Sequence, residues 1–576
     1  MIKTTISSIS NNVNNYIVIL NKFILTIYNK GDTILLANLA KKIKKGIQIM
    51  LEAIFSSKIF IKVLTGLSAF LMLFLSPGGH IAQPAAADKC PKFMGEVAVA
   101  DEMDEIVVPQ NPYLAKEGRN GMHGNSYNTG CYNNMGPLGN NCVVNSRSLN
   151  VFGGLVATCM FDSQGRIMCI SGNVVGFRLL LLDPDTLEIL AETRLPQRPS
   201  TIEAIKRFDF ASISSDTSGG AYCHLYEGDK PIIGNSENVI QIYYVDESTG
   251  TPVWKVEKEY NISSYLPEGS YITDAMPDYK GNIWFVTRPG EVGYIEKGTD
   301  KVYLTKLTFE GKGEEIQNTF GMAEDGVYIV SDHAMYRFDI KEDGTPDYTW
   351  RTSYDRGTTL KPGAINQGSG TTPTLLDVPC ADGSIKKVVA ITDNADKQVH
   401  VCIYDRENGD IIAEVPVFTE GKSVSENSLI AHGRSFIVEN NYSESGSGFL
   451  VTDPTSEPGV VRIDLNEDCT DAFIAWESQE ASCTVVPKLS TKNGLVYLYT
   501  REYDDAEDTD DDGIPEGKVA WYLTAVDFNT GETVFKVFTG IGRNWNNSYG
   551  PITIGPNNTL YVGVFNGIIS VKDSVK

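Results

Sequence analysis

A short turn motif recurs eight times in this 576-residue chain, at intervals of about 56 residues, and it restricts the fold more than any other feature. In each copy an apolar run ends in an acidic residue, a turn follows, and a second apolar or aromatic run begins. The acidic residues are Asp183, Asp246, Glu296, Asp339, Asp405, Asp464, Asp527 and Asp573. Aspartate can bond the backbone of its own turn, and the glycine found in most copies supplies a positive φ angle. The motif therefore predicts a repeated β-hairpin.

A second hairpin precedes the motif in several copies, as at 162–165, 278–281, 324–326 and 493–494. Helical periodicity is nearly absent after residue 90, and β-branched and aromatic residues fill the short runs between turns. Two hairpins make four strands, and a four-stranded unit repeated around an axis is a β-propeller blade. We therefore expect an all-β propeller of eight four-stranded blades over residues 151–576, with seven blades as the alternative. A two-domain β-sandwich would not repeat a hairpin at this period.

The chain ends just after the third strand of the last copy, so closing the ring requires a strand from the N-terminal side. We expect Glu105–Pro109 to be that strand. Residues 88–150 then form an irregular lead-in to the propeller. Within it, residues 111–127 are rich in Gly and Asn, fit no strand or helix, and include Arg119 and His123. This stretch is expected either to cap the propeller axis or to run over the surface.

The first 87 residues differ in charge from the rest: they hold nine Lys and two acidic residues, whereas residues 88–576 carry a net charge of −31. A body this acidic would be repelled by phosphate backbones, which excludes nucleic-acid binding. The apolar run Ile59–Leu75, its basic flank and the small residues up to Ala87 are typical of a secretory signal. We therefore expect cleavage near Ala87 and a secreted or periplasmic protein. A signal left uncleaved as a membrane anchor is the alternative.

All ten cysteines follow this signal, and an even set in an exported chain predicts disulfides. Short loops favour the pairs Cys131–Cys142, Cys159–Cys169 and Cys469–Cys483, although spacing alone leaves the connectivity open. Cys159 and Cys169 are expected to face each other on neighbouring strands. No C-x-x-C pair occurs, so neither a tetrathiolate zinc site nor a thioredoxin-type motif is supported.

One face of the propeller is the expected working face. With strands labelled A to D from the axis outward, the B–C and D–A loops emerge on the same side, opposite the acidic turns of the motif. The candidate ligand-binding residues in these loops are Asp332, His333, Asp393, Asn394, Glu426, Asn427, Glu439, Asn440 and Asn441. Carboxylate and amide oxygens suit Ca²⁺ or a polyhydroxylated ligand, although each residue alone is also a common turn former. We expect them to be exposed loop side chains that converge near the axis.

The acidic stretch 504–517 is expected as an insertion between two strands. Asp508, Asp510 and Asp512 occupy positions 1, 3 and 5 of an EF-hand-type loop and Gly513 occupies position 6, as in the calcium loops of thrombospondin type 3 repeats. Position 12 is Val519 rather than Glu, so Glu516 is a further candidate ligand. The alternative is a solvated acidic loop. The motif favours a structural Ca²⁺ site.

The copy Val-Asp246-x-x-Thr-Gly-x-x-x-Trp254 resembles the blade motif of the quinoprotein alcohol dehydrogenase-like propellers, and the resemblance covers Gly153–Lys576. It implies a propeller that binds pyrroloquinoline quinone and a central Ca²⁺, and the residues here that match the calcium ligands are Glu426, Asn427, Asp393 and Asn394. Non-catalytic relatives of these enzymes act in outer-membrane assembly. The enzymes typically cover the quinone with a disulfide between adjacent cysteines, and this chain has no adjacent cysteines.

Two classes of function remain. The missing cysteine pair favours an exported propeller that binds a small-molecule or protein ligand at the B–C and D–A face, with calcium in a structural role. The alternative is a periplasmic quinoprotein-type oxidoreductase that uses pyrroloquinoline quinone and Ca²⁺. A more remote alternative is an arylsulfotransferase-like enzyme, in which a histidine nucleophile works beside an arginine that binds sulfate, as at Arg119–His123 and His432–Arg434.

Overall fold

The computed structural model describes residues 90–116, 118–149, 155–173, 176–207, 216–444, 456–504, 518–565 and 567–574. The expected signal segment, 1–87, and the candidate calcium ligands Asp508, Asp510, Asp512 and Glu516 lie outside these residues. Contacts divide the chain into two compact units, Met1–Leu73 and Phe74–Lys576, and all the described residues belong to the second. Within that described part, no helix is long and apolar enough to cross a membrane.

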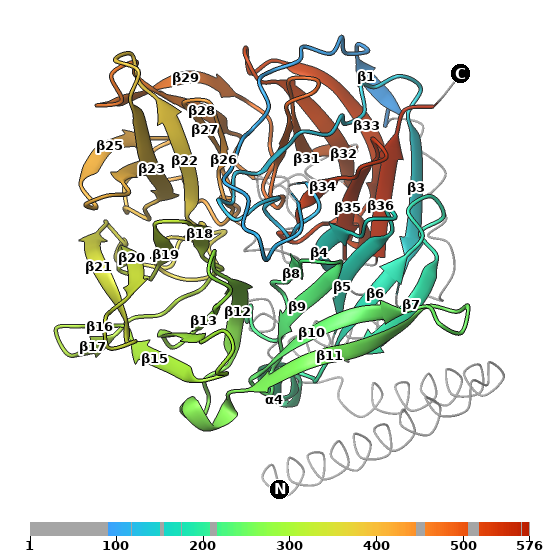
Figure 1. Cartoon of the computed structure of the whole chain (residues 1–576). Helices are drawn as coiled ribbons and strands as arrows, with labels where there is room; N and C mark the ends of the chain where they lie inside the picture. The colour runs from blue at the N-terminus through green and yellow to red at the C-terminus, as the bar shows by residue number, and fades with distance from the viewer. Residues whose placement is uncertain are drawn as a thin grey trace, which may run out of the picture. The chain divides into compact units, whose positions relative to one another are not determined.

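The described residues form eight blades around an axis, which confirms the predicted all-β, eight-bladed propeller (Figure 1). Blade 1 is β4 (Leu155–Phe161), β5 (Ile167–Asn173), β6 (Gly176–Leu182) and β7 (Ile189–Arg194); blade 2 is β8 (His224–Tyr226), β9 (Lys230–Gly234), β10 (Val239–Asp246) and β11 (Val253–Asn261). Blade 3 is β12 (Ile272–Pro277), β13 (Ile283–Thr287), β14 (Glu291–Ile295) and β15 (Val302–Lys306); blade 4 is β18 (Gly321–Ala323), β19 (Gly326–Val330), β20 (Ala334–Ile340) and β21 (Pro346–Ser353).

The remaining blades follow the same order from the axis outward. Blade 5 is β22 (Thr374–Pro379), β23 (Ile385–Thr392), β24 (His400–Asp405) and β25 (Ile411–Pro416); blade 6 is β26 (Ile430–His432), β27 (Ser435–Glu439), β28 (Val460–Leu465) and β29 (Ala472–Ser478). Blade 7 is β30 (Lys488–Ser490), β31 (Leu495–Asp504), β32 (Lys518–Asp527) and β33 (Thr533–Ile541); blade 8 is β34 (Ile552–Ile554), β35 (Leu560–Val564), β36 (Gly567–Lys572) and β3 (Val143–Ser148).

A few short elements lie outside this pattern. Blade 7 is extended to six strands by β1 (Phe93–Gly95) at its outer edge and by β2 (Cys131–Tyr132) at its inner edge. The hairpin β16 (Thr308–Phe309) and β17 (Lys312–Gly313) joins blades 3 and 4, and α4 (Pro199–Arg207) lies between blades 1 and 2. Two short 3₁₀ turns are η1 (Ser263–Tyr265) and η3 (Arg543–Trp545).

The apolar core lies between the faces of adjacent blades. One cluster joins Val401 of β24, Ile437 of β27 and Leu498 of β31, three residues that are fully buried. Because a blade packs against a neighbour on each side, its central strands are apolar on both faces. All five residues of β13 are buried, and the first four, Ile283–Val286, form an uninterrupted apolar run.

The ring is closed by β3, which pairs antiparallel with β36 from Val143↔Lys572 to Ser148↔Gly567 (Figure 1). The closing strand comes from the N-terminal side, as expected, but the choice of Glu105–Pro109 was wrong. Residues 105–109 form no strand, and the backbone of Ile106 instead exchanges two hydrogen bonds with the side chain of Asn133. Side-chain partners, rather than a neighbouring strand, satisfy this short β-branched run.

The eighth acidic residue of the repeat acts at this junction. Asp573 accepts hydrogen bonds from the backbone N–H groups of Leu138 (2.7 Å) and Asn140 (2.8 Å). In the seventh copy, Asp527 accepts the backbone N–H of Thr530 (2.8 Å) within one continuous turn. Asp573 therefore bonds the incoming N-terminal segment as the earlier aspartates bond their own hairpins.

Tryptophans on the outer strands lock neighbouring blades together. Nε1 of Trp350, in β21, donates to the carbonyl oxygen of Arg406 in the C–D turn of blade 5 (3.0 Å). Gly409 of that turn has φ +78°, and a Cβ added to it would lie 2.6 Å from the Trp350 ring. Trp476 repeats the arrangement against blade 7, where a Cβ on Gly531 would also lie 2.6 Å from the indole. The glycine of the motif thus serves both the turn and the contact between blades.

Replacing Gly409 with Ala should destabilise the fold more than the same change at Gly298, a matched C–D turn glycine with φ +84° and nothing within 4 Å of its added Cβ. Both changes place alanine in the left-handed region, which costs about 1 kcal/mol. Only Gly409→Ala also displaces an indole, which adds about 1–3 kcal/mol. Urea unfolding of both variants measures the difference, and equal losses would show that Trp350 does not depend on this glycine.

The cysteines pair differently from the expectation. Among the described residues, which include all ten cysteines, one disulfide forms, between Cys380 and Cys469, whose Cα atoms are 5.8 Å apart. It joins turns of blades 5 and 6 that are 89 residues apart in the chain, so the predicted Cys469–Cys483 pair was wrong. Cys142 instead bonds to Asp573 through its thiol (3.4 Å), rather than to Cys131. Cys159 and Cys169 do face each other across β4 and β5, as predicted, but as two thiols.

Candidate functional site

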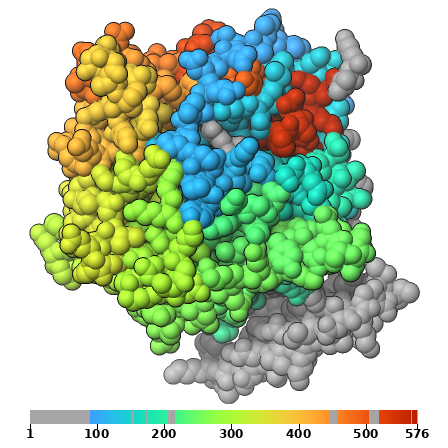
Figure 2. All heavy atoms as spheres, viewed as in Figure 1, coloured from blue at the N-terminus to red at the C-terminus, as the bar shows by residue number. Residues whose placement is uncertain are grey.

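The stretch with Arg119 and His123 enters the propeller axis, and we call residues 111–132 the plug. In Figures 1 and 2 the blue N-terminal part of the described chain covers the centre of the ring. Backbone carbonyls of the plug accept hydrogen bonds from inner-strand N–H groups of four successive blades. These bonds are Met322 to Ser126, Leu375 to Tyr127, Ala431 to Thr129 and Leu489 to Gly130, at 2.8 to 3.0 Å. The plug therefore fills the space between the inner strands.

The plug enters from the face of the A–B and C–D turns. Arg119 donates to Asp229, in the A–B turn of blade 2 (2.6 Å), and the N–H of Glu227 in the same turn donates to the carbonyl oxygen of Tyr113 (2.8 Å). His123 lies deeper, where its Nε2 is 3.4 Å from Oγ of Ser428. Arg119 thus anchors the plug at its entrance, while His123 reaches the interior.

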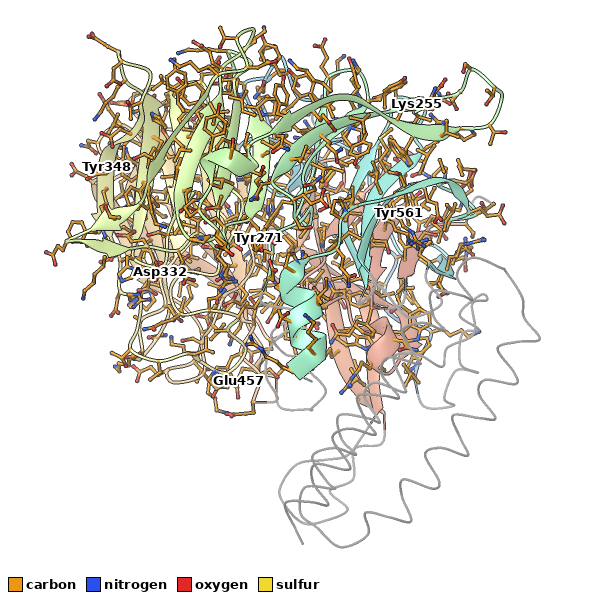
Figure 3. The ribbon with its side chains drawn as sticks, turned by 90° about the horizontal axis from the view of Figure 1, so that it is seen from below. Lys255, Tyr271, Asp332, Tyr348, Glu457 and Tyr561 are labelled. Carbon is orange, nitrogen blue, oxygen red and sulfur yellow. A yellow bond between two sulfur atoms is a disulfide. The ribbon has the colours of Figure 1, made fainter. Side chains whose placement is uncertain are left out.

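The opposite face carries the B–C and D–A loops. Figure 3 shows the propeller edge-on, with Lys255, next to a C–D turn, at one face and Glu457, in a B–C loop, at the other. The long D–A loop 354–373 between blades 4 and 5 spans several blades on this second face. Tyr549 donates to the carbonyl oxygen of Gly363 in this loop (2.8 Å), and Asn318 donates to that of Gly370 (2.7 Å). This loop lies against the residues that approach the axis.

Below this loop, five buried polar residues gather at the axis, and we call Glu426, Asn427, Glu439, Lys488 and His123 the axial cluster. They come from four local elements: the D–A loop before β26, which holds both Glu426 and Asn427, the end of β27, the start of β30 and the plug. All five are nine-tenths or more buried. Glu426, Asn427 and Glu439 are therefore not the exposed loop side chains expected from the sequence, because the plug and the loop 354–373 take the place of solvent.

Glu439 is surrounded by hydrogen-bond donors. Asn427 Nδ2 (2.5 Å) and Asn441 Nδ2 (3.3 Å) donate to its Oε1, and the hydroxyl of Ser482 donates to Oε2 (2.6 Å). Burial raises the pKa of Glu439 to about 8, although these donors and the charge of Lys488 act in the opposite direction. The carboxyl group is therefore largely protonated at neutral pH.

Glu426 is in a similar environment. It accepts a hydrogen bond from Gln317 Nε2 (3.0 Å), and its own backbone N–H donates to Oδ1 of Asn441 (2.6 Å). Burial raises the pKa of Glu426 to about 8. Asn441 thus links the two acidic residues of the axial cluster.

Lys488 and His123 supply the basic groups. The Lys488 ammonium group donates to the carbonyl oxygens of Val486 (3.3 Å) and Pro487 (3.1 Å), and burial lowers its pKa to about 7. Burial also lowers the pKa of His123, with smaller contributions from the charges of Lys488 and His224. His123 Nδ1 has no hydrogen-bond partner among the described residues. In this cluster the pKa values of the acids are raised and those of the bases are lowered, so each group is shifted toward its neutral form.

A histidine–aspartate pair lies beside the cluster. His224 Nε2 is 2.9 Å from Oδ2 of Asp274, and the Thr319 hydroxyl donates to the same oxygen. The three residues come from blades 2, 3 and 4. Asp274 is thus fixed by two partners, and the ring of buried polar groups extends over more than half of the blades.

Most of the other predicted site residues are held by local partners. Oδ2 of Asp393 is 2.8 Å from Nδ1 of His400, and its Oδ1 accepts the backbone N–H of His400 (2.7 Å). This hydrogen bond to Asp393 raises the pKa of His400. Asp332 forms an ion pair with Arg356 (2.8 Å) and lies 2.9 Å from Nδ1 of His333. Asp332 thus bonds the B–C loop of blade 4 to the following D–A loop, and Asp393 bonds the B–C loop of blade 5 to its own C strand.

The two remaining asparagines also bond to the backbone of nearby loops. Asn394 donates to the carbonyl oxygen of Arg356 (3.2 Å), and Asn440 donates to that of Lys422 (2.9 Å) and accepts the N–H of Val424 (3.2 Å). Arg119 and Arg434, each predicted to work beside a histidine, have other partners. Arg119 donates to Asp229, and Arg434 donates to the carbonyl oxygen of Pro379 (3.3 Å).

The residues that the resemblance assigned to a central Ca²⁺ do not form a shared oxygen cage. Glu426 accepts its hydrogen bond from Gln317, in the loop before blade 4, whereas Asp393 is bonded to His400 in blade 5. Carboxylates that already accept N–H and O–H groups fit a protonated or hydrogen-bonded network better than a hard cation. Among the described residues, no group of three His, Cys, Asp or Glu side chains is placed to hold a metal ion.

Two members of this region escaped the sequence analysis. His224 and Lys488 are the first residues of the inner strands β8 and β30, within segments that otherwise read as core. Lys488 does carry a signal, because a lysine between the apolar residues Val485, Val486 and Leu489 is rarely buried without a role. His224 carries none beyond its residue type.

Known proteins share limited similarity with this chain. No protein-family model matches the chain. An uncharacterised protein from Archaeoglobus fulgidus is 26% identical over 337 residues, which cover 53% of this chain and 62% of the relative, so the match spans less than two thirds of that protein.

Solved structures that resemble the chain include β-propellers of several kinds. A quinohemoprotein alcohol dehydrogenase from Pseudomonas putida has a TM-score of 0.48 and 11% identity, over 81% of this chain and 84% of that one. A streptogramin B lyase has a TM-score of 0.36 and 11% identity, over 75% and 98% of the two chains.

Proposed function

We propose that this protein binds a small polar ligand at the axial cluster, below the loop 354–373. The observation that carries the proposal is the convergence of Glu426, Glu439, Lys488 and His123 at one buried place on the axis. Ionisable groups are costly to bury, and groups of them with displaced pKa values are typical of ligand and active sites. A cluster that served only to pack the propeller could be replaced by apolar side chains at no cost in stability.

The chemistry of the cluster indicates the ligand class. Protonated Glu426 and Glu439, the Asn427 amide and His123 offer both donors and acceptors, without a large net charge. Such a set can bind hydroxyl, amide or carboxylate groups through hydrogen bonds. The plug closes the axis from one side, so the ligand would enter from the B–C and D–A face.

Lys488→Met should abolish binding of that ligand without loss of stability, because among the described residues the ammonium group of Lys488 bonds to two carbonyl oxygens and to no carboxylate. We expect at least a tenfold loss of affinity, about 1.4 kcal/mol. Lys492→Met is the matched control, since Lys492 lies four residues further on and forms ion pairs with Glu102 and Glu105 on the opposite face.

The measurement is a thermal-shift and calorimetric screen of a defined panel: glucose, glycerol, acetate, glutamine, and pyrroloquinoline quinone with Ca²⁺. A compound bound by the wild type and by Lys492→Met, but not by Lys488→Met, supports the proposal. The proposal fails if no compound binds the wild type, or if Lys488→Met binds every hit as tightly as the control. A quinone absorption band in the wild type would identify the oxidoreductase alternative.

A further inference from the structure

One arginine close to the axial cluster has a guanidinium group without a partner among the described residues. Arg501, in β31, is 4% exposed, and none of its three guanidinium nitrogens has a hydrogen-bond partner among the described residues. An unpaired buried cation costs several kcal/mol, and nearly all buried arginines in folded proteins are paired. Arg406 illustrates the usual arrangement: it is fully buried and forms ion pairs with Asp325 (2.5 Å) and Asp377 (2.8 Å).

The position of Arg501 connects it with the proposed site. It lies opposite Trp521 in the pairing of β31 and β32, and its backbone N–H donates to the carbonyl oxygen of Ala481 (3.3 Å). Cys483, two residues after Ala481, lies close to both Arg501 and Glu439. Burial raises the pKa of the Cys483 thiol, the charge of Arg501 acts to lower that pKa, and the charge of Glu439 acts to raise it. Ser482, between them, donates directly to Glu439 (2.6 Å). The segment 481–483 therefore bridges the guanidinium and the axial cluster.

We infer that Arg501 binds the carboxylate group of the axial ligand, an inference that rests on the proposed function and specifies its substrate class. A guanidinium presents a planar pair of N–H donors that matches a carboxylate, and such bonds are stronger in a site shielded from water. One unpaired cation matches one negative charge. The strongly acidic body of the protein disfavours multiply charged anions such as phosphate.

The experiment compares Arg501→Met with Arg406→Met, the same substitution at two buried sites that differ in pairing. Melting temperatures are measured in sodium acetate, in sodium phosphate and in sodium chloride at equal ionic strength. Acetate should raise the melting temperature of the wild type above its value in chloride, because a ligand that binds only the folded state stabilises it. Arg501→Met should abolish this shift, yet melt in chloride at or above the wild-type temperature. Arg406→Met should melt several degrees lower in chloride and keep the acetate shift.

Three outcomes would overturn the inference. In the first, acetate does not raise the melting temperature of the wild type above its value in chloride. In the second, phosphate raises it more than acetate does. In the third, the melting temperature of Arg501→Met in chloride falls as far as that of Arg406→Met. The last would mean that the guanidinium is paired within the chain. If the screen with Lys488→Met identifies a ligand that Arg501→Met binds as tightly as the wild type, the proposed function stands and only this inference fails.

Discussion

Replacing Arg406 with Met should lower the free energy of unfolding by about 3–5 kcal/mol, because it leaves two carboxylates at a buried site without their cation. Arg406 joins Asp325 of blade 4 to Asp377 of blade 5. Burial acts to raise the pKa of Asp325, but the charge and the hydrogen bond of Arg406 outweigh it, and the pKa lies below its usual value. The guanidinium also lies 4.9 Å from the ring of Tyr127 in the plug. One side chain thus connects two blades and the plug.

Urea unfolding at neutral pH measures this loss, with Lys206→Met as the control. Lys206 forms its ion pair with Glu203, three residues away on α4 (2.6 Å), and both side chains are exposed. A local pair of this kind contributes about 1 kcal/mol or less. If the two variants lost equal stability, the connection between blades would not be what makes Arg406 important.

The propeller and its blade number follow from the sequence because the information is local. Each acidic turn bonds its own backbone, as Asp183 does with the N–H of Thr186 (2.8 Å), and the motif marks every C strand wherever it occurs. The closing strand could not be chosen in this way. Residues 105–109 and 143–148 are both short β-branched runs, and the choice between them depends on Asp573, more than 400 residues away. The local sequence contains no information about a contact over such a distance along the chain.

The candidate site was predictable in position but not in environment. The D–A and B–C loops predicted that Glu426 and Glu439 would approach the axis from one face, since that follows from strand order alone. Their burial depends on the plug, which is held by backbone hydrogen bonds to four blades, and backbone bonds place no demand on residue type. The disulfide shows the same limit, because Cys380 and Cys469 meet only through the packing of adjacent blades.

Glu439→Gln should change how the stability of the protein depends on pH. Because burial raises the pKa of Glu439 to about 8, from 4.5 in an exposed glutamate, the folded state keeps a proton that the unfolded chain releases. This contribution is complete below pH 4.5 and is lost as the pH rises toward 8. Glutamine does not titrate, so wild type minus variant stability should fall between pH 5 and pH 7, by up to about 1.4 kcal/mol per pH unit.

The window stops at pH 7 because Lys488 titrates above it with the opposite effect, and its interaction with the charge of Glu439 means that its contribution does not cancel between wild type and variant. With its pKa lowered to about 7, the folded state releases a proton that the unfolded chain keeps up to 10.5, so stability rises with pH through that range. Glu426 titrates in both proteins and cancels in the difference. Glu420→Gln, the same substitution at an exposed glutamate paired with Lys397, is the control for the effect of the residue change itself. Urea unfolding of wild type and Glu439→Gln at pH 5, 6 and 7 measures the difference in stability. A difference that does not change with pH would mean that the Glu439 carboxyl is ionised in the folded state. The axial cluster would then carry a negative charge able to repel an anionic ligand.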